Sequence, residues 1–207
     1  MHARSTTIQA RPADIDGGLR HIRETVLPAL ENIDGFTGIS CMCDRESGMC
    51  IVTTAWRSAD AMLASAERVR SLRDTAAQRL GATTAQVDEW EIAVLHRDHL
   101  SADGACVRAV WTQTDPANLD HAIDTFKMVS LPAMEQTQGF CSASLMVDRA
   151  TGAGVGSVAY DSMDSMTLTR EQTEEMRQRI TRDAHVDVLQ VREFELAMAH
   201  LRVPELA

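Results

Sequence analysis

The stretch Leu27-Pro28-Ala29-Leu30-Glu31 returns 104 residues later as Leu131-Pro132-Ala133-Met134-Glu135. This one repeat extends, without a gap, over almost the whole chain: residues 4–96 align with residues 108–200 at 28 identities in 93 positions. Such a period marks two copies of one structural unit. We therefore predict two similar domains and a fold in which the copies complete one another.

The repeat sets the expected domain boundaries. The first copy spans residues 1–98 and the second spans residues 106–207. Between them, residues 99–105 contain Ser101-Ala102-Asp103-Gly104, a composition typical of a polar linker. Each copy is small enough that, alone, it would bury only a modest core.

Hydrophobic periodicity predicts the same element order in both copies. In the first copy, four strands are expected near residues 5–11, 37–43, 50–56 and 87–96, with helices after the first and third. This βαββαβ order is that of a ferredoxin-like unit. Its sheet would carry both helices on one face and leave the other bare, so the second sheet is needed to cover it. The expected fold is α+β, a pseudo-dimeric eight-stranded barrel that leaves no open sheet edge.

Helix and turn signals recur at matching positions. Asp14 and Asn118 are expected N-caps of the first helix in each copy, and Ser58 is expected to cap the second. Gly35 and Gly139 are expected to adopt the left-handed conformation that ends a helix.

Composition limits the possible partners and compartment. The net charge of −10 argues against nucleic acid and against an anionic membrane surface. Neither a signal-peptide core nor a run of about 20 apolar residues is visible. The five cysteines favour free thiols in a reducing compartment, so we expect a cytoplasmic protein.

Several motifs together resemble the antibiotic-biosynthesis monooxygenase-like family of the dimeric α+β barrel superfamily. They are Gly35-Phe36-x-Gly38, the hairpin Asp44–Gly48, the run Thr54-x-Trp56-x-Ser58-x-Asp60-x-Met62 and Glu89-Trp90-Glu91. Members of that family are usually single ferredoxin-like domains that pair as homodimers. This chain resembles such a dimer fused in tandem, an intramolecular pseudo-dimer for which further oligomerisation stays open.

The resemblance implies a small-molecule site between sheet and helices. Some members of the family oxidise aromatic polyketides without metal or flavin, and others degrade haem. The haem-degrading branch uses an Asn on the first strand and a Trp and a His on the second helix. The matching positions here are Thr7, Ser65 and Asp74 in the first copy and Trp111, Thr169 and Gln178 in the second. Haem oxygenation is therefore not expected.

The candidate residues for a ligand pocket are mainly aromatic or lie near the expected cleft, although core packing or a solvated helix flank would also explain them. They are Thr7, His21, Ile22, Thr54, Trp56, Trp111, Phe126 and Tyr160. Trp111 and Phe126 are bulkier than their counterparts Thr7 and Ile22. We therefore expect the larger pocket in the first copy.

Other reactive side chains have structural alternatives. Cys41, Cys43 and Cys50 could form a metal or redox cluster, but they have no cysteine counterparts in the second copy, which favours packed thiols. The last strand of each copy carries two carboxylates on one face, Glu89 with Glu91 and Glu193 with Glu195, which could act in acid/base chemistry or bind arginine or backbone partners. No catalytic residue can be assigned, and no metal site or cofactor is expected.

Two functions remain open. One is cofactor-independent oxygenation of an aromatic or polyketide-like compound, in which the substrate itself activates oxygen inside an apolar pocket. The other is non-catalytic binding of a small apolar metabolite.

Overall fold

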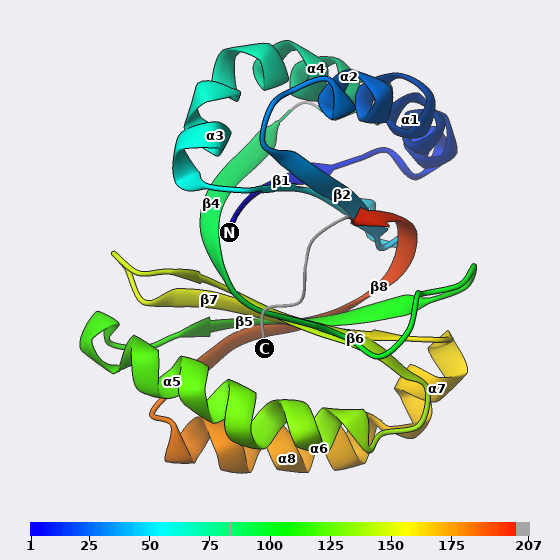
Figure 1. Ribbon diagram of the computed structural model, residues 1–207. Coiled ribbons are helices and arrows are strands. Elements are labelled where there is room, and N and C mark those ends of the chain that lie inside the picture. Colours follow the sequence, from blue (N-terminus) through cyan, green and yellow to red (C-terminus); the bar gives the residue numbers. More distant parts are fainter. Residues whose placement is uncertain (83, 202–207) are drawn as a thin grey trace. The chain divides into compact units, whose positions relative to one another are not determined.

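The computed structural model describes residues 1–82 and 84–201 (Figure 1). Both copies have the βαββαβ order that the sequence predicts. The strands are β1 (His2–Gln9), β2 (Phe36–Cys43), β3 (Met49–Trp56), β4 (Ala85–Arg97), β5 (Cys106–Gln113), β6 (Phe140–Asp148), β7 (Ala153–Tyr160) and β8 (Asp187–Leu201). The α-helices are α1 (Ile15–His21), α2 (Leu27–Glu31), α3 (Ala59–Ala64), α4 (Ala66–Arg79), α5 (Leu119–Thr125), α6 (Leu131–Glu135), α7 (Met163–Leu168) and α8 (Arg170–Asp183).

The eight strands form one closed antiparallel barrel in the order β1-β3-β2-β8-β5-β7-β6-β4. Equivalent strands pair in equivalent registers: Ile8 lies opposite Cys50, and Thr112 lies opposite Gly154. Both copies also carry the same irregularity, because Thr37 and Cys141 are extra residues in the β2–β3 and β6–β7 ladders. The predicted fold class, a tandem pseudo-dimeric α+β barrel, is confirmed.

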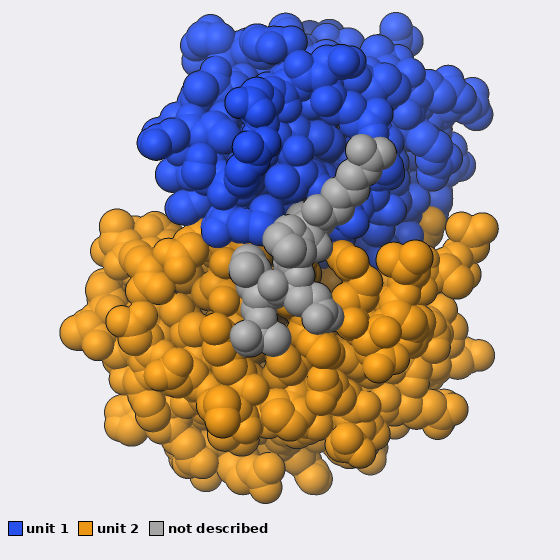
Figure 2. Space-filling view, viewed as in Figure 1, with its two compact units in different colours: residues 1–90, 196–203 blue, residues 91–195, 204–207 orange. Residues whose placement is uncertain are grey.

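The compact units exchange strand ends between the two copies (Figure 2). Unit 1 contains Met1–Trp90 together with the end of β8 from Leu196 onward, and unit 2 contains Glu91–Glu195. Met198 accordingly belongs to the buried core of unit 1, and Val94 to that of unit 2. The last strand of each copy thus begins in one unit and ends in the other.

A histidine–glutamate contact lies at each of these exchanged ends. His96, near the end of β4, places its Nε2 2.7 Å from Glu135 Oε1 in unit 2. Equivalent His200 on β8 places its Nε2 3.3 Å from Glu31 Oε1 in unit 1. The glutamates are the last residues of the repeated stretch that begins at Leu27 and Leu131, so part of that repeat serves to bind the other copy's strand.

The expected caps are partly confirmed. Ser58 Oγ accepts a hydrogen bond from the Ala61 amide at 3.2 Å, as a helix N-cap should. Gly35 and Gly139 have φ angles of +81° and +74°, the left-handed conformation predicted for them. The prediction for Asp14 and Asn118 is wrong, because neither side chain caps its helix.

A short 3₁₀ turn explains the failed caps. It precedes the first helix in each copy: η1 (Pro12–Asp14) and η3 (Pro116–Asn118). In the second copy the cap moves upstream, where the Asp115 side chain accepts from the Ala117 amide. Asn118 instead donates to the Ala184 carbonyl at 2.7 Å and so ties this turn to the end of α8.

A π-helical turn interrupts the first helix of each copy: η2 (Ile22–Val26) and η4 (Phe126–Ser130). Each turn ends just before α2 or α6, whose second residue is the repeated proline. A proline cannot donate the usual helical hydrogen bond, and a wider turn accommodates this loss. No helix within residues 1–82 and 84–201 is long and apolar enough to span a membrane.

Candidate functional site

An apolar cavity lies within unit 2, between one face of its sheet and the helices that cover that face. Its volume is about 130 Å³. Strands β5, β6 and β7 supply its floor, and α5, η4 and α8 supply its roof. The lining is mostly apolar, with Phe126 and Tyr160 as its aromatic members and several threonines among the rest.

The equivalent cleft in unit 1 has a volume of only about 40 Å³. The expectation that the first copy holds the larger cleft is therefore wrong. At three of the equivalent positions unit 2 has glycine or alanine in place of a larger side chain: Cys50 corresponds to Gly154, Val52 to Gly156, and Leu80 to Ala184. In unit 1, Leu80 is fully buried in the core and fills the space that its counterpart leaves open.

Two of the predicted pocket residues, Trp111 and Thr7, face the other side of the sheet. Along β5 the cavity is lined by Arg108, Val110 and Thr112, which alternate with Trp111. Because successive side chains of a strand point to opposite faces, Trp111 cannot fill the cavity. It packs edge-to-face on Phe194, with ring centroids 6.4 Å apart. Thr7 has the same parity on β1 and is likewise absent from the lining of the unit 1 cleft.

The other predicted pocket residues divide between the two units. Ile22 and Thr54 line the small cleft of unit 1, whereas His21 does not. Trp56 is fully buried, and its Nε1 donates to Thr54 Oγ1 at 3.1 Å, so it belongs to the core. In unit 2, Phe126 and Tyr160 do line the larger cavity. Each cleft is thus lined by two of the eight predicted residues.

Unit 1 also has an open surface depression of about 330 Å³ between the loop at Gly35 and the start of α3. Asp34, Arg57 and Asp60 lie at its rim, and the Arg57 and Asp34 side chains are 71% and 99% exposed. An apolar ligand would gain little from so exposed a surface, because its binding depends on leaving water.

A buried arginine anchors one end of the unit 2 cavity. The Arg108 side chain is only 5% exposed, and its Nε and Nη2 both donate to Glu193 Oε1, at 3.0 and 2.8 Å. Further donation goes to Thr173 Oγ1 at 2.7 Å and to the Met166 carbonyl at 2.8 Å. Its Cζ lies 5.8 Å from the Tyr160 ring centroid. Arg108 is therefore fully engaged with the protein.

The same anchor exists in unit 1, where Arg4 donates to Glu89 Oε1 and to the Met62 carbonyl. Its presence in both copies, one with an open cavity and one without, favours a structural role for this pair. The structural alternative for the repeated glutamates thus has direct geometric support.

Arg177 is the second guanidinium of the cavity lining. Burial lowers its pKa from the ordinary value; Glu174 opposes the shift and Arg108 adds to it. Its Nη2 lies 3.8 Å from Glu174 Oε1, a loose ion pair. Because a guanidinium stays protonated in proteins, Arg177 places a positive charge beside an apolar space.

The residues that line the cavity include no carboxylate, imidazole, thiol or amine within the described part of the chain. The lining can therefore orient and polarise a ligand, but it offers no conventional general base.

The first copy's cysteines are free thiols in the core of unit 1. Cys41 Sγ and Cys43 Sγ lie 3.8 Å apart. The hydrogen bond to Cys43 and then burial raise the pKa of Cys50 far above its ordinary value. The Cys50 thiol is therefore protonated, and all three thiols are buried, which agrees with packing rather than nucleophilic chemistry.

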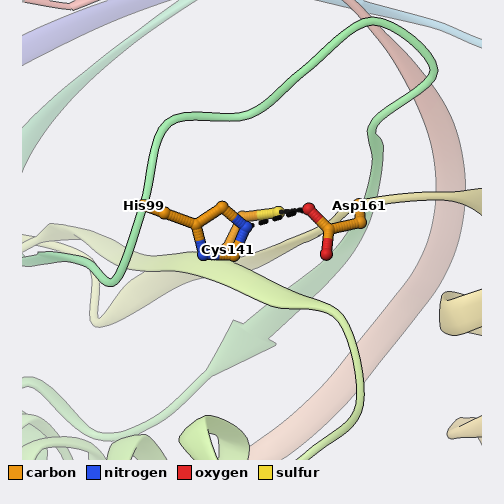
Figure 3. A group of neighbouring side chains, drawn as sticks. All are labelled: His99, Cys141 and Asp161. Atoms are coloured by element: carbon orange, nitrogen blue, oxygen red, sulfur yellow. Dashed lines mark hydrogen bonds and ion pairs between the residues drawn. The ribbon is translucent and has the colours of Figure 1, made fainter.

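A cluster of three polar side chains lies in unit 2, outside the cavity lining. His99, Cys141 and Asp161 come from three separate segments and point toward one another (Figure 3). His99 Nε2 is 2.9 Å from Asp161 Oδ1, and Cys141 Sγ donates to the same oxygen at 3.2 Å. Burial, and then the hydrogen bond to Asp161, raise the pKa of Cys141 to about 12. The free thiol is thus a poor nucleophile.

No family model matches the chain. It is, however, 50% identical to the protein Rv2557 of Mycobacterium tuberculosis (strain ATCC 25618 / H37Rv), over 100% of this chain and 92% of the relative. The protein Rv2558 of the same strain is also 50% identical, with 87% of its length covered. The chain belongs to the family of these two mycobacterial proteins.

Solved structures share the fold over nearly the whole chain. A candidate monooxygenase from Lactobacillus acidophilus NCFM superposes with a TM-score of 0.72 at 12% identity, covering 97% of this chain and 96% of that one. An anthrone oxidase-like protein gives 0.66 at 13% identity, with 100% and 95% coverage. The haem-degrading enzyme LmHde from Listeria monocytogenes gives 0.54 at 8%, with 94% and 99% coverage. The fold expected from the resemblance is confirmed.

The repeat in the sequence already marks the two arginines of the cavity lining. Arg108 and Arg177 return the first copy's Arg4 and Arg73 at the repeat offset. The widening at Gly154 and Gly156 was visible as a glycine-rich run, but its effect depends on what lies across the cleft. His99, Cys141 and Asp161 gave no signal, because their chain separation hides their proximity.

Proposed function

We propose that unit 2 binds a small aromatic phenol or quinol in its cavity and promotes the reaction of that molecule with O₂ without a cofactor. The observation that carries the proposal is an apolar cavity of about 130 Å³ with the Arg177 guanidinium in its lining. A cavity of about 150 Å³ lined by aliphatic and aromatic side chains is known to accept benzene. The size therefore suits one aromatic ring.

Arg177 supports the chemistry because a partly buried positive charge favours the anionic form of a phenol. A phenolate or quinolate is electron-rich, and electron transfer from it to O₂ begins the oxidation. The reaction balances without an external reductant. For methylhydroquinone, one oxygen atom of O₂ enters the ring to give a hydroxylated methylbenzoquinone, and the other leaves as water with two substrate hydrogens.

The fold neighbours add support, since one of them is described as anthrone oxidase-like. Anthrone has three fused rings and would need a larger space than this cavity offers. We therefore place the preferred substrate in the one-ring class.

Oxygen uptake with methylhydroquinone tests the proposal. Uptake should exceed the rate of spontaneous oxidation, and ¹⁸O₂ should leave one label in the quinone product. Gly156→Val restores the residue of unit 1 and should abolish the excess, because a Cβ at this position already approaches Phe126 Cε2 to 3.6 Å. Val52→Ala, a change in the small cleft, is the matched control and should leave the rate unchanged.

A second variant tests the charge of Arg177 separately from the volume of the cavity. Arg177→Gln should weaken binding of the substrate anion by at least about tenfold, the equivalent of about 1.4 kcal/mol. Arg73→Gln, the equivalent change in unit 1, should not. An unlabelled quinone, or uptake that ignores Gly156→Val, would contradict catalysis in this cavity.

Non-catalytic binding is the second candidate. It is favoured by the cavity lining, which contains no general base within the described residues. Stoichiometric, Gly156→Val-sensitive binding of methylhydroquinone without excess oxygen uptake would establish this alternative.

A further inference from the structure

We propose that His99, Cys141 and Asp161 bind one Zn²⁺ ion. Their potential ligand atoms all lie within 4.8 Å of one another. None of the three residues lines the apolar cavity of unit 2, so this site is independent of the proposed oxygenation. The proposal departs from the sequence-based expectation of no metal, which considered only Cys41, Cys43 and Cys50.

The backbone fixes all three positions. Cys141 is the extra residue of the bulge at the start of β6, and bulges turn a side chain out of the regular ladder. Its carbonyl accepts hydrogen bonds from the amides of Asp98 and His99, at 2.9 and 3.3 Å. The Asp161 amide donates to the Gly139 carbonyl at 2.8 Å. The segments that carry the ligands are thus held to one short stretch of chain.

The ligand atoms are close to the spacing of a metal site. Asp161 Oδ1 is 2.9 Å from His99 Nε2 and 3.2 Å from Cys141 Sγ. Bond lengths of about 2.0–2.3 Å in a tetrahedral zinc site correspond to ligand separations of about 3.3–3.7 Å. A small opening of the cluster would therefore admit the ion. Zn²⁺ would replace the hydrogens that now lie between these atoms.

The chemistry of the ligands selects zinc. One thiolate, one imidazole nitrogen and one carboxylate form a mixed set that Zn²⁺ accepts readily, whereas Mg²⁺ and Ca²⁺ prefer oxygen alone. The thiolate and carboxylate together balance the charge of the ion. Because the His99 and Asp161 side chains are 42% and 48% exposed, a water molecule can reach a fourth position.

Asp98 supplies a feature that a plain hydrogen-bond cluster would not need. Its Oδ2 lies 2.8 Å from His99 Nδ1, which directs Nε2 toward Cys141 and Asp161. A carboxylate behind a ligating histidine is a recurrent orienting device of zinc sites. Asp98 is therefore assigned as a positioning residue.

The first copy provides an internal comparison. Thr37 and Arg57 occupy the positions of Cys141 and Asp161 on the same bulge and turn, and the Arg57 amide makes the same bond, to the Gly35 carbonyl at 2.8 Å. The bulge and the turn therefore form without a thiol and a carboxylate at these two positions. The counterpart of His99, position 203, lies outside the described residues.

Cobalt titration of the chelator-treated full chain tests the proposal. Co²⁺ should bind at one ion per chain, give a thiolate-to-cobalt charge-transfer band in the near ultraviolet, and be displaced by Zn²⁺. Cys141→Ser should remove the band. His99→Gln, at an exposed position where folding is not at risk, should weaken Co²⁺ binding by at least about a hundredfold. Asp98→Asn should keep the band but weaken binding by about 10- to 100-fold.

Cys106→Ser is the matched control, since Cys106 is another buried free thiol of unit 2. It should leave both band and affinity unchanged. The proposal is overturned if the wild-type chain gives no band, if the band survives Cys141→Ser, or if His99→Gln binds Co²⁺ as tightly as wild type.

Discussion

The cleft between sheet and helices is nearly closed in unit 1 and open in unit 2, at about 40 and 130 Å³. Both units keep the same buried arginine–glutamate anchor at one end of the cleft. Three cleft positions that carry a larger side chain in unit 1 are glycine or alanine in unit 2, at 154, 156 and 184. A duplicated scaffold can therefore keep its core in both copies and open a binding site in only one.

Opening a cavity has a stability cost, which the closed unit avoids. Removing buried side-chain volume costs the transfer free energy of the lost atoms and leaves a void. Unit 2 tolerates such a void, and we take this as the reason to look for a ligand there.

The largest effect should come from separating the copies. Residues 1–98 alone lack Met198 and Ala197, which pack in the core of unit 1, and they lack the partner strand end for β2. We expect this fragment to aggregate or self-associate, as measured by sedimentation. A soluble monomer with a cooperative unfolding transition would show that the exchanged strand end is dispensable.

Leu80→Ala should make unit 1 resemble unit 2. Leu80 is fully buried, so truncation should destabilise the chain by about 2–5 kcal/mol in urea unfolding. It should also enlarge the small cleft enough to accept one aromatic ring. Calorimetry with phenol should then give two sites per chain instead of one. A gain in stability or an unchanged stoichiometry would refute Leu80 as the residue that closes the cleft.

A reciprocal exchange tests whether two positions changed together. A Cβ on Gly18 would lie only 2.4 Å from Leu80 Cδ2, so a leucine at position 80 requires glycine at position 18 of the neighbouring helix. In unit 2 the same positions are Ala122 and Ala184. Ala184→Leu alone should therefore be overpacked, and adding Ala122→Gly should relieve it.

We expect a favourable coupling of about 0.5–3 kcal/mol in a double-mutant cycle of unfolding free energies. The double variant should also lose binding of phenol to unit 2. Additive effects of the two substitutions would mean that the side chains at positions 122 and 184 are not in contact.

The sequence alone predicts the barrel but not the position of the open cleft. The exact repeat offset predicted the barrel, because two sheets with bare faces have few ways to bury them. It could not predict which cleft is open, since that depends on side chains from β7 and α8 that meet only after folding. The choice of Trp111 failed for a simpler reason: strand parity was not assigned, and a shift by one residue places a side chain on the other face.

His99, Cys141 and Asp161 show a different limit. No local pattern joins residues this far apart in the chain, and the repeat does not carry them. Their meeting depends on the bulge at Cys141 and on the path of the chain just after β4. Neither feature has a reliable sequence signal.

The smallest expected effect is a difference in acid sensitivity between the two anchors. Burial alone would raise the pKa of Glu193, but hydrogen bonds from Arg108 and Arg170 outweigh it and hold the pKa below the ordinary value. A carboxyl whose pKa is lowered on folding adds stability above its unfolded pKa of about 4.3. That contribution disappears as the pH falls through the folded pKa.

Glu193→Gln should therefore be less stable than wild type at pH 7, and the gap should narrow below about pH 4. Hydrogen exchange resolved by peptide can follow each unit separately. Glu89→Gln is the matched variant in unit 1; Ala66 stands where unit 2 has Arg170, and the Glu89 side chain is 42% exposed against 24% for Glu193. Its effect should be smaller, because solvent screens an exposed pair more strongly. Equal effects of the two substitutions would mean that Arg170 adds nothing to the anchor of unit 2.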